Sequence, residues 1–269
     1  MFTMDGMYRA WSSLVARATT PPPSNCPPAS PAAASGATTL AHPPKASAAD
    51  PPAPPATPAP LLACLRARRS IMPRRYVKDA PPVPAATMRR MLEAAMWAPF
   101  HGPVPPWRFV VLGKEAMVAM QHLTLEYYDA NWQDVGWADG QRGSEAQYQA
   151  WRAMTEGEIR GRWGPVSYMV AIVVRRQAGS KRMPAWEEAA ATACAVQNMH
   201  VQACAEPGLA CYWSSWHDAA RDSAEMRAFL NMGEEDRCLG FFIVARGKVG
   251  RKDNRQRTAE THLDVEWRP

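Results

Sequence analysis

The longest hydrophobic run in the chain lies between Pro184 and Trp216 and predicts a helix followed by a short strand. Glu187 and Glu188 come at its start, where carboxylates suit the positive end of a helix dipole. Positions 189–205 are almost all small or apolar, and Glu206-Pro207-Gly208 then ends the helix, because proline cannot continue it and glycine suits a left-handed turn. Residues 209–213 predict a buried strand.

A helix that is apolar on nearly every side is expected to be buried. This one is long enough to cross a bilayer, but its polar members argue against a membrane span; they are Thr192, Gln197, Asn198, His200 and Gln202. We therefore expect no membrane association. We expect the central helix of a soluble core, shared between two subunits.

The remaining pattern alternates helices with strands. Helices are predicted at 61–69, 84–97, 221–230 and within 115–163, where a loop at 136–143 interrupts them; strands are predicted at 108–112, 168–174 and 239–245. The helix at 84–97 is amphipathic, with Met88, Met91, Leu92, Ala95 and Met96 on one face and Arg89, Arg90 and Glu93 opposite. The tryptophans of 115–163 predict either a flap over an apolar pocket or a packed helical subdomain. Elements in this order favour one sheet with helices on its faces, an α/β or α+β sandwich.

Composition divides the chain near residue 60. Residues 1–60 hold 14 of the 26 prolines and five charged residues, so they cannot bury enough apolar surface to offset the entropy of ordering. We expect a disordered Pro/Ala-rich region at 1–60 and one globular domain at 61–269. Arginine enrichment and few acids in the first twenty residues fit an organelle transit peptide, for chloroplast or mitochondrion; a plain low-complexity tail in a cytoplasmic protein is the alternative.

Charge and cysteine content narrow the function further. The net charge is +6, and the three basic and two acidic residues of 1–60 account for +1 of it, leaving +5 on 61–269. No basic face with interleaved aromatics accompanies this mild excess, so nucleic acid is not an expected partner. The six cysteines form no CxxC pair, and His200 with Cys204, four apart on one helix, lack the second ligand pair of a metal site. We predict no metal.

Motifs of several common enzyme classes are missing: GxGxxG, GxxxxGK[ST], GxSxG and HExxH do not occur. What remains is three separated elements. They are Arg68-Arg69-Ser70, a helix ending in Ala98-Pro99 before a loop to Pro106-Trp107, and the helix–Gly208–strand unit that ends in Trp213-Ser214-Ser215. Paired arginines next to a serine offer forked donors and a hydroxyl, which suit a phosphate or a polar ring edge.

In this order and at this spacing, the elements resemble the FMN-dependent nitroreductase family, and the chain is most similar to its compact bacterial NAD(P)H nitroreductase branch. Members carry Arg-Arg-Ser near the start, A-P-x-H before P-W, and W-E at the opening of a long central helix. This sequence has Arg68-Arg69-Ser70, Ala98-Pro99-Phe100-His101 before Pro106-Trp107, and Trp186-Glu187. The match extends from about Leu61 to the C-terminus.

The resemblance implies an α+β, nitroreductase-like sandwich: a central, mostly antiparallel sheet flanked by helices, forming a homodimer through the long buried helix with FMN in the subunit interface. It implies FMN contacts from ten residues, none of them catalytic: Arg68, Arg69, Ser70, Trp97, His101, Trp213, Ser214, Ser215, Arg255 and Arg257. Arg68, Arg69 and Ser70 would meet the phosphate and the pyrimidine side, and the Trp213 segment would lie along the flavin. Either Arg255 or Arg257 would supply a further phosphate contact.

The implied activity is that of a flavoprotein oxidoreductase. NADPH or NADH reduces FMN and leaves, and a nitroaromatic, quinone or similar small-molecule acceptor then takes the electrons in a ping-pong hydride-transfer cycle. Because a flavin performs this chemistry itself, no acid–base pair is required of the protein. Phe100, Pro103 and Pro105 replace polar residues of many members, which keeps open the alternative of flavin binding without reductase turnover. Another reaction of the superfamily, such as reductive dehalogenation, also stays open because those enzymes share the fold and motifs.

Overall fold

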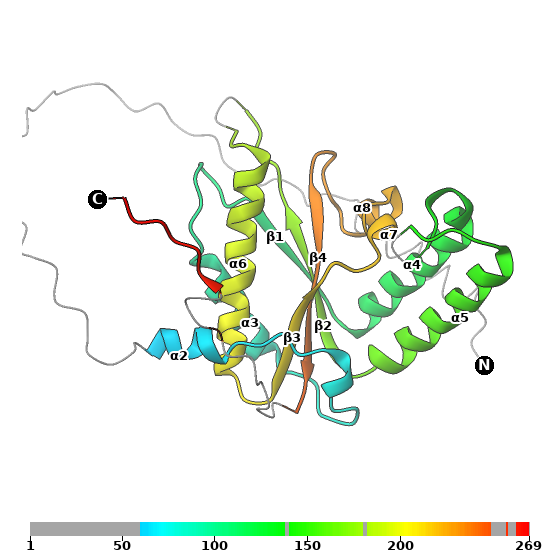
Figure 1. The fold of residues 1–269 in the computed structure, drawn as a ribbon, viewed down its shortest axis with the longest axis horizontal. Helices are drawn as coiled ribbons and strands as arrows, with labels where there is room; N and C mark the ends of the chain where they lie inside the picture. Colours follow the sequence, from blue (N-terminus) through cyan, green and yellow to red (C-terminus); the bar gives the residue numbers. More distant parts are fainter. Residues whose placement is uncertain (1–59, 138–139, 180–181, 249–256, 258–261, 269) are drawn as a thin grey trace, which may run out of the picture. The chain divides into compact units, whose positions relative to one another are not determined.

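A computed structural model describes residues 60–137, 140–179, 182–248, 257 and 262–268. Within these ranges the chain forms one four-stranded sheet in the order β1-β2-β4-β3 (Figure 1). The strands are β1 (Trp107–Leu112), β2 (Val166–Val174), β3 (Leu209–Ser214) and β4 (Arg237–Arg246), and every neighbouring pair is antiparallel. The predicted strands and the antiparallel sheet are confirmed.

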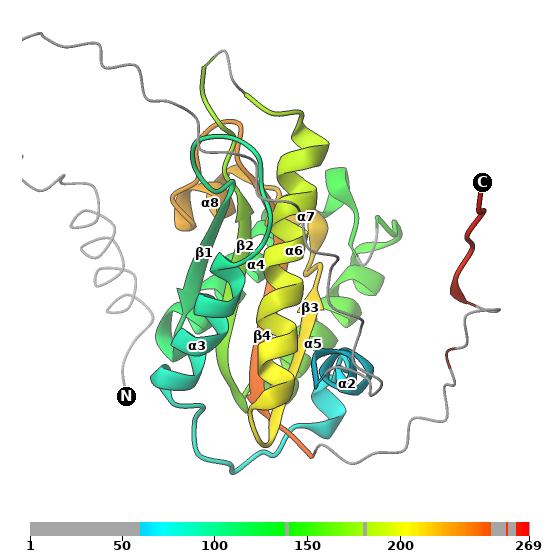
Figure 2. The ribbon, with the colours of Figure 1, turned by 90° about the vertical axis from the view of Figure 1, so that its left-hand side faces the viewer.

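One face of the sheet is covered by α3 (Ala85–Met96) and α6 (Ala185–Ala205), and α2 (Pro60–Ala67) lies against α6 (Figure 2). Alternate positions of the strands point to this face and join the helices in one hydrophobic cluster. Its members include Met91, Val170, Met199 and Phe242, each fully or almost fully buried. The sequence pattern of α6 therefore packs as predicted on its inner side.

The opposite face is covered by α4 (Lys114–Val135) and two short helices, α7 (Asp218–Arg221) and α8 (Ala224–Phe229). The prediction of a single helix over 221–230 is wrong, because two short helices lie there instead. Asp222 ends α7 and the Ser223 hydroxyl caps α8 by accepting from the Met226 amide, so the chain turns between them. Side-chain capping competes with helix continuation at such residues.

A hairpin of α4 and α5 (Glu145–Arg162) carries its own aromatic cluster. Trp132 stacks on Tyr148 with ring centroids 4.8 Å apart, and Tyr128, Trp137 and Trp151 surround this pair. Trp132, Trp137 and Trp151 thus pack in a helical subdomain, whereas Trp163 lies outside this cluster and lines a cavity. A reciprocal cap between Ser144 and Gln147 starts α5.

Two helices are less buried than their patterns predict. Met96 was placed on the buried face of α3 but is 66% exposed, because the helix ends there and the chain turns away. The outer side of α6 is open in the single chain, with Trp186, Cys194, Gln197 and Cys204 exposed. The predictions for residues 1–59 fall outside the described residues. Across the described ranges, no helix has the length and hydrophobicity needed to span a bilayer.

Candidate functional site

The Arg68-Arg69-Ser70 segment follows α2 and is fixed between α6 and β3. The Arg68 amide donates to the Cys64 carbonyl (2.9 Å), which closes α2, and the Ile71 amide donates to the Cys211 carbonyl of β3 (3.0 Å). Arg68 is half-buried, while Arg69 and Ser70 are exposed. The segment therefore presents cationic and hydroxyl groups along the outer edge of β3, which is an edge strand of the sheet.

His200, on the buried side of α6, holds this segment from beneath. Its Nε2 lies 3.0 Å from the Arg69 carbonyl oxygen and its Nδ1 lies 3.4 Å from Arg68 Nη1. The ring is 6% exposed and packs edge-on against Phe242. Burial, and then the neighbouring Arg68 guanidinium, lower the pKa of His200 to about 4. The imidazole is therefore neutral at physiological pH.

The lowered pKa of His200 predicts acid sensitivity. In the unfolded chain its pKa is about 6.5, so the unfolded state binds a proton first as pH falls, and stability present above about pH 6.5 is lost toward pH 4. Between pH 7 and pH 5 this loss is about 2 kcal/mol. Urea titrations of the wild type and His200→Gln at both values measure it. The groups around the ring are Arg68, Cys204 on α6 and Cys211 on β3. If the wild type and His200→Gln lose equal free energy of unfolding between pH 7 and pH 5, the acid sensitivity does not come from His200.

The Trp213-Ser214-Ser215 segment lies at the end of β3, on the same edge as Ile71. The Trp213 indole donates to the Leu239 carbonyl (2.8 Å) across the end of β4. Ser214 lines a cavity of about 150 Å³ between β3 and α5, together with Thr155, Glu158, Ile159, Trp163, Trp216 and His217. Trp216 adopts φ 62°, a conformation that costs a bulky side chain energy and that clusters at functional sites.

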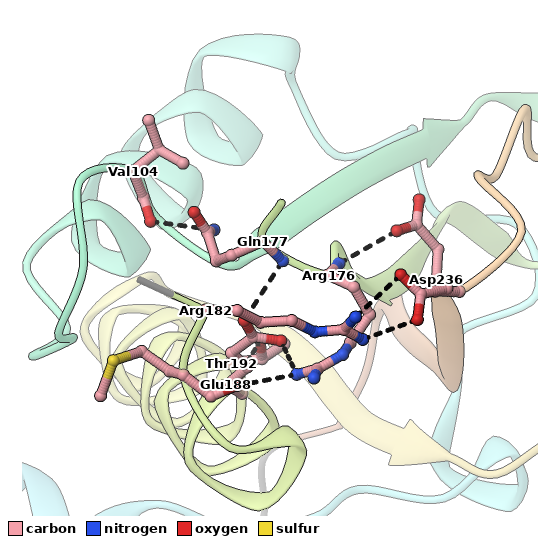
Figure 3. A network of polar contacts seen from close by, with 9 residues as sticks. Val104, Arg176, Gln177, Arg182, Glu188, Thr192 and Asp236 are labelled. Atoms are coloured by element: carbon pink, nitrogen blue, oxygen red, sulfur yellow. Dashed lines mark hydrogen bonds and ion pairs between the residues drawn. The ribbon is translucent and has the colours of Figure 1, made fainter. Parts of the chain in front are cut away.

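His101 and Trp97 lie in and before the loop that joins α3 to β1, near the start of α6. The His101 imidazole pairs with Glu187 in the first turn of α6. Figure 3 shows a second set of hydrogen bonds to this loop. The Gln177 side chain donates to the Val104 carbonyl (3.1 Å), and the Gln177 backbone amide donates to the Glu188 carboxylate (3.2 Å). Trp97 is 81% exposed.

Within one chain, the candidate residues fall into two groups. His200 contacts Arg68 in the first group and Glu187 pairs with His101 in the second, and these two α6 positions are about 20 Å apart along the helix. One group, Arg68 to Ser70 with Trp213 to Ser215, follows the β3 edge; the other, Trp97 with His101, lies at the beginning of α6. Arg257 is exposed, and Arg255 lies outside the described residues.

His200 is the residue whose role the sequence did not reveal. A histidine in an apolar helix was considered only as half of a metal pair with Cys204. The Cys204 thiol instead bonds the His200 carbonyl within the helix (3.4 Å), and the described residues contain no group of three or more ligands for a metal ion. The partners of His200, Arg68 and Arg69, lie 132 and 131 positions away in sequence, so no local sequence pattern could identify them.

Comparison with known proteins finds one sequence family that matches this chain and several solved structures with a similar fold. The sequence model of the nitroreductase family matches residues 65–248. No curated protein matches the sequence. Among solved structures, a nitroreductase-like family protein from Bacillus cereus is 16% identical with a TM-score of 0.56, over 79% of this chain and 99% of that one.

Two further structures share the fold. A nitroreductase with bound FMN from Bacteroides fragilis is 21% identical with a TM-score of 0.54, covering 78% of this chain and all of that one (100%). An FMN-dependent nitroreductase from Mycobacterium smegmatis, solved in complex with NADPH, is 15% identical with a TM-score of 0.53, covering 77% and 97%. At these identities the likeness concerns the fold.

Proposed function

The chain belongs to the nitroreductase family, and we propose that it is an FMN-dependent oxidoreductase that uses NADPH or NADH to reduce nitroaromatic, quinone or similar acceptors by ping-pong hydride transfer. When bound, FMN supplies the hydride chemistry, so the protein has to bind it, orient it and exclude water. The observation that carries the proposal is the Arg68-Arg69-Ser70 segment held on the β3 edge beside Trp213 to Ser215.

The donor set of this edge fits a phosphorylated flavin. Two guanidinium groups and a hydroxyl can hold a phosphate by charge-assisted hydrogen bonds. His200 contacts the Arg68 guanidinium and the Arg69 carbonyl, and the Arg69 guanidinium donates to the carbonyls of Arg66 and Arg68, so both cationic groups are placed along this edge. Ser214 and Trp213, further along the same edge, suit the ring system.

We propose that the protein is a homodimer with FMN between the subunits. The open side of α6 supports this, because a second copy would cover it together with exposed apolar side chains of α2, α3 and α6; among them are Leu61, Leu65, Trp97 and Trp186, each at least 42% exposed. Glu187, which pairs with His101, and His200, which contacts Arg68, are about 20 Å apart along α6, so a second copy would bring Trp97 and His101 of one subunit to the Arg68 edge of the other.

The cavity beside Ser214 supports an aromatic acceptor. Its volume of about 150 Å³ is comparable to an engineered cavity that binds benzene, so it admits one substituted ring. Trp163 and Trp216 provide aromatic walls, while Thr155 and Glu158 provide polar groups. This combination suits a nitroaromatic or quinone.

The absorption spectrum of the purified protein tests the proposed function. We expect flavin bands, either as isolated or after adding FMN, and we expect them to bleach on anaerobic addition of NADPH or NADH and to return when a quinone is added. Flavin uptake tests cofactor binding, and bleaching tests reduction by the nicotinamide donor. Bands that do not bleach would favour flavin binding without turnover, and a protein that takes up no FMN would refute the proposal.

A further inference from the structure

One buried side chain, His200, contacts both arginines of the Arg68 to Ser70 segment. The Arg69 guanidinium folds back on its own segment, where it donates to the carbonyls of Arg66 (2.5 Å) and Arg68 (2.8 Å). The Arg68 guanidinium and the Arg69 carbonyl are instead bound by His200. Two contacts between this segment and α6 therefore converge on one imidazole, and the Arg69 backbone also bonds Cys204 of α6.

The two contacts assign the hydrogens of that imidazole. A guanidinium has donors and no acceptor, so Nδ1 must offer its lone pair to Arg68. A carbonyl oxygen accepts, so Nε2 must carry the hydrogen that is donated to Arg69. Only the neutral tautomer protonated on Nε2 makes both bonds, and the lowered pKa keeps the ring in that neutral state.

The arrangement is rigid. The ring packs edge-on against Phe242, with centroids 5.1 Å apart, and Phe242 is fully buried in the sheet. The backbone on either side of the segment is tied to α2 and to β3, through Cys64 and Cys211. An apolar side chain would fill the same space without the cost of burying a polar ring, so packing alone does not account for an imidazole here.

We propose that His200 is a positioning residue that orients Arg68 and the Arg69 backbone so that the segment binds the phosphate of the flavin cofactor. This inference rests on the proposed function and deepens it. His200 is buried beneath the segment, so it acts through Arg68 and Arg69. It acts by holding an otherwise flexible arginine in one place, which reduces the entropy that phosphate binding must overcome.

Comparison of FMN with riboflavin isolates this role. The two ligands share the ring system and the ribityl chain, and riboflavin lacks the phosphate. His200→Phe removes both hydrogen bonds in a ring of similar size, His200→Met removes them with a flexible side chain, and His200→Gln can still donate to Arg69 and accept from Arg68. Arg68→Ala serves as the direct reference. Affinities are measured by flavin fluorescence titration of dimeric, folded protein, with folding checked by circular dichroism.

We expect His200→Phe and His200→Met to weaken FMN about tenfold, the size of one lost hydrogen bond to a charged group, and to leave riboflavin unchanged. His200→Gln should restore most of the FMN affinity. A purely structural role predicts equal losses for both ligands, and that result would overturn the inference. If Arg68→Ala loses FMN selectively and the His200 variants do not, only the role of His200 fails. If the wild type does not prefer FMN over riboflavin, the proposed phosphate site fails as well.

Discussion

Replacing Glu188 by alanine is expected to lower the free energy of unfolding by about 3–5 kcal/mol, because it leaves an unpaired buried charge. The Glu188 side chain is 2% exposed and pairs with Arg176, whose side chain is 11% exposed. Glu188 also accepts from the Gln177 amide (3.2 Å), and Gln177 holds the Val104 carbonyl (Figure 3). The loss should therefore extend to the loop that carries His101.

Two controls separate the buried charge from general effects on α6. Glu187→Ala removes the neighbouring carboxylate, whose partner His101 is mostly exposed, and should cost less than about 1 kcal/mol. The double variant Arg176→Met, Glu188→Leu replaces both charges by apolar groups and should recover most of the loss. Urea unfolding of the four proteins gives the comparison. Similar losses for Glu188→Ala and Glu187→Ala would show that the ion pair contributes little.

Gly240→Ala is expected to cost about 4 kcal/mol and to displace the candidate flavin segment. Gly240 has φ 115° at an irregularity in β4, where two residues stand between Cys238 and Phe241 opposite one residue of β2. A Cβ there would lie 2.2 Å from the Ser214 carbonyl oxygen and 3.0 Å from the Trp213 indole nitrogen. Backbone strain costs about 1–3 kcal/mol and overpacking about as much.

Gly140→Ala is the matched control, since Gly140 also has a positive φ (79°) but would meet no atom within 4 Å. It should show the backbone cost alone, about 1–3 kcal/mol. Thermal unfolding measures both variants, and FMN titration reports the displacement of Ser214. Equal effects in the two variants, with FMN affinity unchanged, would mean that β3 accommodates the methyl group without moving.

Much of the fold could be predicted from local pattern. The hydrophobic run of α6, its acidic first turn and its Pro-Gly end specify helix and strand within a few residues of where they lie. The predicted strands at 108–112, 168–174 and 239–245 all exist. Periodicity worked because it acts over neighbouring residues. It failed at 221–230, where the Ser223 cap outweighs the helical pattern, and at Met96, where the helix end removes the buried face.

The sequence by itself determined the order of the elements, the apolar faces that pack on the sheet, and the Arg68-Arg69-Ser70 and Trp213-Ser214-Ser215 motifs that indicate the family. Only the tertiary structure decided how these motifs are arranged: that they share the β3 edge, that His101 pairs with Glu187 at the start of α6, and that His200 holds Arg68. The physical reason is range. Helix and strand patterns depend on spacings of two to four residues, whereas His200 meets residues more than a hundred positions away, and such contacts exist only once the sheet has formed.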